Sequence, residues 1–251
     1  VSNPFLKETL GMFLKYGGKK DKVNFDEAGI LEVADLLNSP NTHIEAILHD
    51  FGNKTQREDP VIHFYELFLT EYDKEKKIER GVFYTPQPVV SFIVRSVHEI
   101  LQNEFGLEDG LASTITWGEM QTRNKHIEIP NGVSPNEPFV TILDPAVGTG
   151  TFLVEVIDVI AKHTISKWEK AGFSQKDIQK LWDEYVSKAL LPRIYGFELM
   201  MAPYVITDIK LTLKLTEISR TLGELFYRNA GKVRFNIFLT NSLEGPTQTA
   251  D

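Results

Sequence analysis

Hydrophobic residues in the first third of the chain recur every three to four positions, the spacing of amphipathic helices. Two such patterns, Ile30–Leu37 and Ile44–Phe51, are separated by the helix-breaking residues Asn38–Pro40. A third pattern runs from Val61 to Leu69 and leads into a strongly charged stretch. We therefore expect residues 1–80 to form an N-terminal helical region.

A new helix is predicted after residue 84. Thr85 suits the N-cap because its side-chain oxygen can accept a hydrogen bond from a free backbone amide, and Pro86 suits the first helical position. The apolar residues at helical spacing predict the buried face, which would include Val89, Ile93, Val97 and Leu101.

The region between Gly106 and Pro138 is rich in Gly, Asn and Pro and holds two short β-prone runs. These runs, Ser113–Trp117 and His126–Ile129, predict two strands. We expect the region to be an insertion that carries a β-hairpin.

From residue 139 onward, short β-branched runs alternate with longer helical patterns. The predicted strands are Phe139–Leu143, Arg193–Phe197 and Val233–Leu239, and the predicted helices are Thr151–Ile165, Ser174–Leu190 and Ala202–Leu222. Strands that are separated by helices favour a parallel sheet. The fold class predicted for this part of the chain is therefore α/β.

Composition narrows the function classes. The 251 residues include no cysteine, which excludes disulfides, thiolate metal sites and a cysteine nucleophile. The net charge of -8 argues against a surface that grips DNA on its own, because phosphate contacts need clustered Lys and Arg. No apolar run is long enough to span a membrane and no signal peptide is evident, so we expect a cytoplasmic protein. The non-Met start and the polar tail suggest part of a longer protein.

A glycine-rich turn lies where the strand that ends at Leu143 meets the helix that begins at Thr151. Its glycines, Gly148 and Gly150, allow a tight turn and let a ligand lie against the backbone, and the following helix offers free N–H groups. A carboxylate such as that of a methionine moiety would fit there, and Asp144 could face its ammonium group. A turn that merely connects strand and helix is the structural alternative.

Other nucleotide-binding motifs fit poorly. A dinucleotide-binding fold needs a small residue where this chain has Leu153, and a P-loop needs Gly-Lys-Ser/Thr, which is absent. The histidines form no pair at metal-ligand spacing, and we expect structural roles for all of them: His43, His49, His63, His98, His126 and His163.

Two segments carry a family resemblance. Residues 144–153, Asp-Pro-Ala-x-Gly-Thr-Gly-x-Phe-Leu, and residues 81–86, Gly-Val-Phe-Tyr-Thr-Pro, resemble motifs I and X of adenine-N6 DNA methyltransferases. The order X before I resembles the gamma class, which includes type I modification subunits. The sequence of Tyr65–Leu69 and Arg80–Val90 is more similar to that of the single-chain, type ISP-like restriction-modification enzymes. The resemblance covers roughly Pro60 to Leu243.

The resemblance implies an S-adenosylmethionine-dependent methyltransferase (Rossmann-like) domain, incomplete here, with its N-terminal half and motifs X, I, II and III in residues 81–251. It implies site-specific adenine-N6 DNA methylation as part of a restriction-modification enzyme. The implied partners are double-stranded DNA, contacted mostly outside this chain, and a specificity domain, nuclease and translocase in the parent protein.

The resemblance also implies roles for individual residues. Tyr84 and Thr85 would border the methionine end of the cofactor, and Pro86 would fix the start of the helix. Glu198 corresponds to the motif II acid that accepts the ribose hydroxyls, and Asn241 stands where the family often has an Asp that contacts adenine. The motif I residues implied in cofactor binding are Asp144, Pro145, Ala146, Gly148, Gly150 and Phe152. A capped helix start, a surface Glu and a plain Asn turn are the structural alternatives.

The family's motif IV, Asn/Asp-Pro-Pro-Tyr/Phe, does not occur in the 251 residues. We therefore name no catalytic residue and expect the chain to bind the cofactor without methylating DNA by itself. One alternative is a non-catalytic helical coupling or scaffold module with a cofactor-sensing α/β part. A nicotinamide-dependent oxidoreductase is a weaker alternative because of Leu153.

Overall fold

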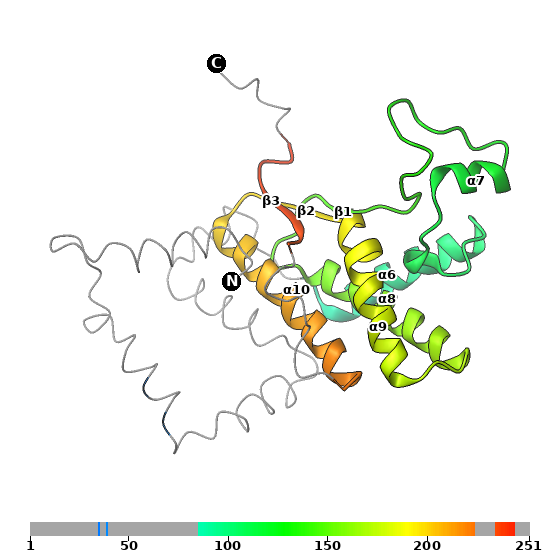
Figure 1. Cartoon of the computed structure of the whole chain (residues 1–251). Helices are drawn as coiled ribbons and strands as arrows, with labels where there is room; N and C mark the ends of the chain where they lie inside the picture. Colours follow the sequence, from blue (N-terminus) through cyan, green and yellow to red (C-terminus); the bar gives the residue numbers. More distant parts are fainter. Residues whose placement is uncertain (1–34, 36–38, 40–84, 224–233, 244–251) are drawn as a thin grey trace, which may run out of the picture. The chain divides into compact units, whose positions relative to one another are not determined.

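The computed structural model describes residues 85–223 and 234–243 together with Asp35 and Ser39. The helical region predicted for residues 1–80 therefore lies outside the described residues, apart from those two positions, and stays a prediction. The described residues from Pro88 onward belong to one unit, which contains the predicted α/β elements (Figure 1).

The unit contains a parallel three-stranded sheet, in the order β1-β2-β3. The strands are β1 (Ile142–Asp144), β2 (Ile194–Glu198) and β3 (Asn236–Leu239). Ile142 is paired with Ile194, and Tyr195 with Asn236. The α/β class with a parallel sheet is thus confirmed. The predicted strands begin too early: Phe139, for example, packs edge-to-face on Trp117 at a centroid distance of 4.7 Å and lies outside β1.

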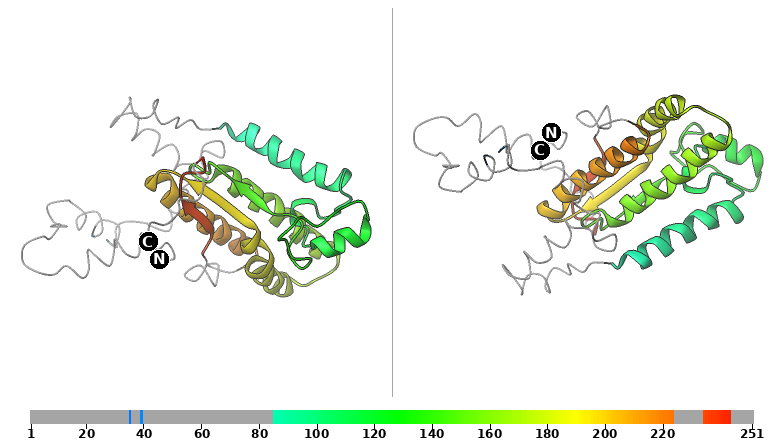
Figure 2. Two further views of the ribbon diagram at one scale, coloured as in Figure 1. Left: turned by 90° about the horizontal axis from the view of Figure 1, so that it is seen from above. Right: turned by 90° about the horizontal axis from the view of Figure 1, so that it is seen from below.

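The main helices, one before the first strand and three between the strands, follow the predicted order. They are α6 (Gln87–Asn103), α8 (Thr151–Lys170), α9 (Gln175–Tyr185) and α10 (Met201–Thr221). Ser174 caps α9, and a π-helical turn (Val186–Leu190) and a 3-10 turn (Leu191–Arg193) lead from α9 into β2. In Figure 1 these helices lie together below the sheet, and Figure 2 shows the same arrangement from above and below.

The two faces of the sheet differ in burial. Side chains alternate between the faces of a strand, and the face toward the helices carries Ile194 and Ile237, both buried in the main core. On the other face, Leu143 is 52% exposed and Phe238 is 44% exposed. No helix among the described residues covers this second face (Figure 2).

The buried face of α6 differs from the prediction. Val89, Ile93 and Val97 are exposed, whereas Val90 and Val94 are buried in the core. The polar partners of the helix explain the orientation: Ser91 Oγ donates to Glu155 of α8 at 2.6 Å, and the Leu111 amide donates to His98 Nδ1 at 3.2 Å. The expected face was therefore wrong by about one residue position, and Leu101 alone of the four predicted residues packs partly against the core.

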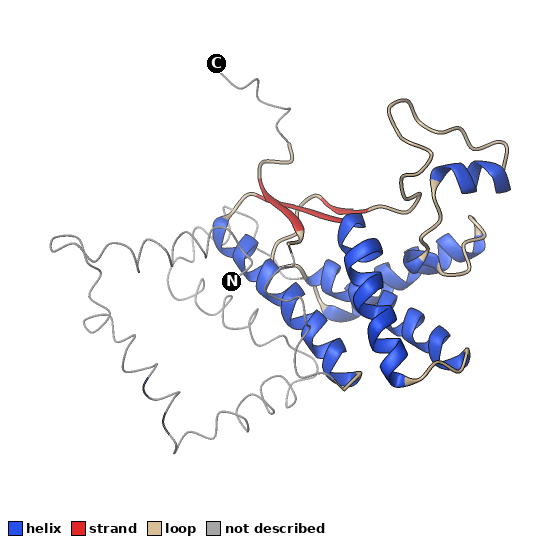
Figure 3. Ribbon diagram, viewed as in Figure 1, coloured by secondary structure: helices blue, strands red, loops and turns tan. Residues whose placement is uncertain are grey.

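The predicted hairpin between residues 106 and 138 is also wrong. This region forms a 3-10 turn, η1 (Gly110–Ala112), and a short helix, α7 (Trp117–Arg123), and most of the remainder is loop (Figure 3). A single antiparallel bridge joins Thr116 to Pro138. A small second core organises the region, and its buried members are Leu107, Ile115, Met120 and Val140.

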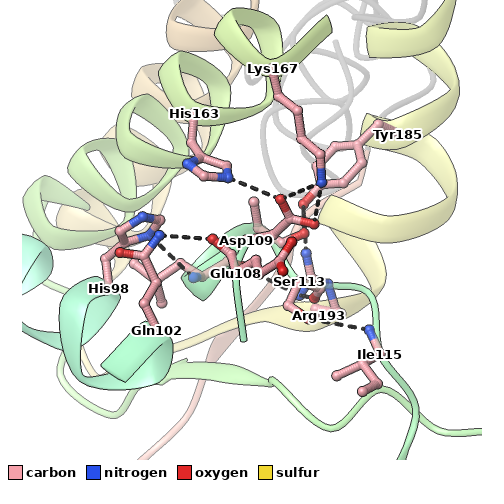
Figure 4. A network of polar contacts seen from close by, with 12 residues as sticks. His98, Gln102, Glu108, Asp109, Ser113, Ile115, His163, Lys167, Tyr185 and Arg193 are labelled. Atoms are coloured by element: carbon pink, nitrogen blue, oxygen red, sulfur yellow. Dashed lines mark hydrogen bonds and ion pairs between the residues drawn. The ribbon is translucent and has the colours of Figure 1, made fainter. Parts of the chain in front are cut away.

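A buried arginine links the region between residues 106 and 138 to the start of β2 through hydrogen bonds (Figure 4). Arg193, only 1% exposed, lies directly before β2 and donates to the Ser113 and Ala189 carbonyls and to the Tyr185 hydroxyl. The Tyr185 hydroxyl in turn donates to the Ala112 carbonyl at 2.8 Å. Because the guanidinium group offers five donors in a fixed plane, it can fix η1, α9 and the start of β2 together.

Candidate functional site

The glycine-rich turn lies at the carboxyl end of β1, as the sequence predicts. Gly148 has φ +55° and Gly150, the N-cap of α8, has φ +80°. Both values fall in the left-handed region that favours glycine. The turn is held close to β2, because the Val147 amide donates to the Phe197 carbonyl at 2.9 Å. The strand–turn–helix arrangement of motif I is therefore present.

Glu198 lies against this turn, although it is 50 residues away from Gly148 in sequence. Its Oε2 accepts a hydrogen bond from the Gly148 amide at 2.8 Å, and its Oε1 accepts one from the Met200 amide at 2.8 Å. The side chain is 8% exposed. A carboxylate has about four acceptor positions, so two positions remain after these contacts. The structure thus brings together the predicted motif I and motif II residues.

Asp144 ends β1 beside the same turn. Its Oδ1 accepts a hydrogen bond from the Ala146 amide at 3.1 Å. Burial raises the pKa of the Asp144 carboxyl, while the hydrogen bond from Ala146 acts in the opposite direction. A half-buried carboxylate whose charged form is disfavoured by burial would be stabilised by a nearby cation. The Asp144 carboxylate can therefore pair with a cationic group.

The start of α8 offers amide donors. The first amides of a helix have no carbonyl partner within it, and the positive end of the helix dipole favours a negative charge there. Among the described residues, the amides of Thr149, Thr151 and Phe152 donate to no other group. The Phe152 side chain packs partly against the main core, while Pro145 and Ala146 are exposed.

Thr207, on α10, is a contact that the sequence analysis missed. Its side chain is fully buried, and its hydroxyl donates to the Gly148 carbonyl at 2.7 Å. No motif marks this residue, because it lies in the middle of an apolar helix pattern. Both backbone polar groups of Gly148 are therefore held by side chains, the amide by Glu198 and the carbonyl by Thr207.

The motif X residues are described only in part. Tyr84 lies outside the described residues, and Thr85 and Pro86 directly precede α6. The bond between Ser91 and Glu155 holds the second turn of α6 against α8, the helix that follows motif I. The contact of Tyr84 and Thr85 with the cofactor stays a prediction.

Asn241 follows β3 at the same edge of the sheet. Glu198 is paired with Leu239 across the two strands, and the Thr240 amide donates to the Glu198 carbonyl at 2.8 Å. The Asn241 side-chain oxygen accepts a hydrogen bond from the Leu243 amide at 3.1 Å. Asn241 thus begins a short turn directly beyond Glu198, and its contact with adenine stays a prediction.

A second polar cluster lies at α8 and η1 (Figure 4). Asp109 bonds to His163 at 3.0 Å and to Lys167 at 2.7 Å. Although burial alone would raise it, the pKa of Asp109 is lowered by its hydrogen bonds to Lys167 and His163. Burial lowers the pKa of His98, whose ring meets that of His163 edge-on at 5.2 Å. Within the described residues, no group of three acidic or histidine side chains could hold a metal ion.

The family comparison identifies one segment. Residues 56–110, which include the predicted motif X and the whole of α6, match the family described as N-6 DNA Methylase. The chain resembles the N-6 DNA methylases. This match confirms the resemblance found in the sequence. It lies N-terminal to the glycine-rich turn, so the two signals come from different parts of the chain.

Among solved structures, two restriction-modification enzymes are similar to this chain. One is a nuclease-deletion mutant of the type ISP enzyme LlaGI in complex with a DNA substrate mimic, with 21% identity over 96% of this chain and a TM-score of 0.47. The other is the ATP-dependent type ISP enzyme LlaBIII bound to DNA, with 19% identity over 94% of this chain and a TM-score of 0.43. The chain spans 14% of the length of each enzyme. A comparison with curated proteins found no match.

The helices in the described part of the chain are not of the membrane-spanning kind. None of them combines the length and the apolar character needed to cross a bilayer.

Proposed function

We propose that the edge of the sheet formed by Asp144, Gly148, Gly150 and Glu198 binds S-adenosylmethionine, and that the chain supplies the cofactor-binding part of an adenine-N6 DNA methyltransferase. The observation that carries the proposal is the 2.8 Å hydrogen bond between the Gly148 amide and Glu198. It joins the two sequence segments that the resemblance assigns to the methionine part and the ribose part of the cofactor.

The chemistry of these residues fits the groups of the cofactor. The free amides at the start of α8 suit the methionine carboxylate, and the Asp144 carboxylate suits the ammonium group. The two remaining acceptor positions of Glu198 suit the two ribose hydroxyls. Each charged or polar part of the ligand would thus meet a complementary group of the chain.

The cofactor would supply a methyl group on a sulfonium centre, and the family's motif IV would hold the target amino group. The tetrapeptide of motif IV is absent from the 251 residues. We therefore propose that this chain binds the methyl donor but does not transfer the methyl group to DNA without further protein. In the parent enzyme, the proposed setting is a restriction-modification protein that acts on double-stranded DNA.

The test is calorimetric titration of the 251-residue chain with S-adenosylmethionine and, separately, with NAD. We expect saturable binding of S-adenosylmethionine and no binding of NAD. The same preparation, incubated with DNA and a radiolabelled methyl donor, should transfer no label. Binding of NAD in preference to S-adenosylmethionine would contradict the proposed cofactor, and methyl transfer by the isolated chain would contradict the proposed division of labour.

A further inference from the structure

Thr207 differs from the other threonines of its helix. A buried threonine inside a helix commonly bonds to the carbonyl of its own helix four residues earlier. Thr212 and Thr216 do this on α10, donating to the carbonyls of Asp208 and Thr212 at 2.9 and 3.0 Å. Thr207 instead directs its hydroxyl out of the helix to the Gly148 carbonyl at 2.7 Å. Its hydroxyl therefore serves the turn and not the helix.

The contact fixes the orientation of one peptide group. A trans peptide is planar, with its C=O and N–H pointing in opposite directions. Because the Gly148 carbonyl points to Thr207 on α10, the Thr149 amide of the same peptide points away from α10. Glycine tolerates several backbone conformations at little cost, so the residue itself gives this peptide little preference. The Thr207 hydroxyl supplies the preference.

The same side chain also packs against the second glycine of the turn. A Cβ atom placed on Gly150 would lie 2.9 Å from Thr207 Cγ2 and 3.2 Å from its hydroxyl oxygen. Thr207 thus contacts both Gly148 and Gly150 from the side of the turn that faces α10. At this place α8 and α10 lie side by side (Figures 1 and 2). Its methyl group fills the space that the missing Cβ leaves.

We propose that Thr207 is a positioning residue for the cofactor: it holds the Gly148–Thr149 peptide so that the Thr149 amide is presented to the methionine carboxylate. This inference rests on the proposed function, because it requires that the turn bind S-adenosylmethionine. Without the hydroxyl, the peptide samples orientations in which a carbonyl oxygen replaces the amide donor and repels a carboxylate. The apparent affinity then falls in proportion to the population of the competent orientation.

The test compares Thr207→Val, which replaces the hydroxyl with a methyl group of similar size, with Thr207→Ser, which keeps the hydroxyl. Thr212→Val is the matched control, because it removes a hydroxyl that bonds only within α10. Dissociation constants are measured by calorimetry for S-adenosylmethionine and for 5′-methylthioadenosine, which lacks the amino-acid carboxylate. We expect Thr207→Val to weaken S-adenosylmethionine binding roughly three- to tenfold, the worth of one hydrogen bond, and to leave 5′-methylthioadenosine binding unchanged. Thr207→Ser and Thr212→Val should bind both ligands as the wild type does.

The outcomes separate the two proposals. If the wild-type chain binds S-adenosylmethionine and Thr207→Val binds it equally well, or loses both ligands to the same extent, Thr207 is only structural and the inference is overturned. If the wild type binds neither ligand, the proposed function fails and the inference fails with it. Should Thr207→Val not fold, Thr207→Ala also lacks the hydroxyl and must show the same selective loss.

Discussion

Replacing Gly150 with alanine tests how tightly the glycine-rich turn is packed on α10. Gly150 has φ +80°, and a side chain in the left-handed region costs about 1–2 kcal/mol. A Cβ atom would also approach Thr207 Cγ2 to 2.9 Å, an overlap of the kind that costs about 1–3 kcal/mol in a packed interior. We therefore expect Gly150→Ala to lower the free energy of unfolding by about 2–5 kcal/mol, the sum of both effects.

Gly172 provides the control for the backbone contribution. It has φ +82°, and no heavy atom lies within 4 Å of the position that a Cβ atom would take there. Gly172→Ala should thus lose only about 1–2 kcal/mol. Urea denaturation followed by circular dichroism measures both variants. Adding Thr207→Ser to Gly150→Ala removes Cγ2 and should recover part of the loss. Equal destabilisation by the two alanine variants, with no recovery by serine, would refute the close packing described for the turn.

Two further substitutions probe the ends of the sheet. Asp144→Asn should weaken S-adenosylmethionine binding roughly 10- to 100-fold in calorimetry, because the negative charge that pairs with the ammonium group is lost. Because the folded-state pKa of Asp144 is raised, the folded state holds the proton more tightly, and the stability that Asp144 contributes is lost as pH rises through that pKa. In the absence of ligand, the stability of the wild type relative to Asp144→Asn should therefore fall as pH rises through that pKa. A larger pH-dependent loss in the variant would contradict this sign. Arg193→Lys should cost about 2–4 kcal/mol in urea denaturation, because one ammonium group cannot satisfy the acceptors that the guanidinium group holds. Since Arg193 precedes β2 and Glu198 ends it, cofactor affinity should be unchanged, and a marked loss of affinity would show that the two ends are coupled.

The parallel sheet and the glycine-rich turn were predictable because their signals are local. A short β-branched run, two glycines and a long helical pattern follow one another along the chain, and each constrains its neighbour. The meeting of Glu198 with Gly148 was predictable from the resemblance, because carboxyl ends of parallel strands lie at one edge of a sheet.

The buried face of α6 could not be predicted from periodicity, because the apolar side chains of this helix are spread over most of its circumference. Val89, Val90, Ile93 and Val94 form adjacent pairs, so two faces are almost equally apolar. The buried side is decided by the hydrogen bonds of Ser91 and His98 to groups that are distant in sequence.

The error in the hairpin region had a local signal that was overlooked. Thr116 and Glu119 form a capping box, in which each side chain accepts a hydrogen bond from the backbone of the other. The spacing Thr-x-x-Glu is a known mark of a helix start. Thr207, in contrast, has no such mark, because its importance depends on the packing of α10 against α8.

The double hydrogen bond of Glu198 has a consequence for mutagenesis of the site. Its two carboxylate oxygens accept hydrogen bonds from the Gly148 and Met200 amides in the absence of any ligand. An alanine at this position would leave both amides without their acceptor, and a glutamine would turn an NH2 group toward one of them. If either variant failed to bind a nucleoside, the cause could be a changed conformation of the turn or the loss of the proposed ribose contact, and the measurement would not separate the two. Asp144 and Thr207 are therefore the more informative positions.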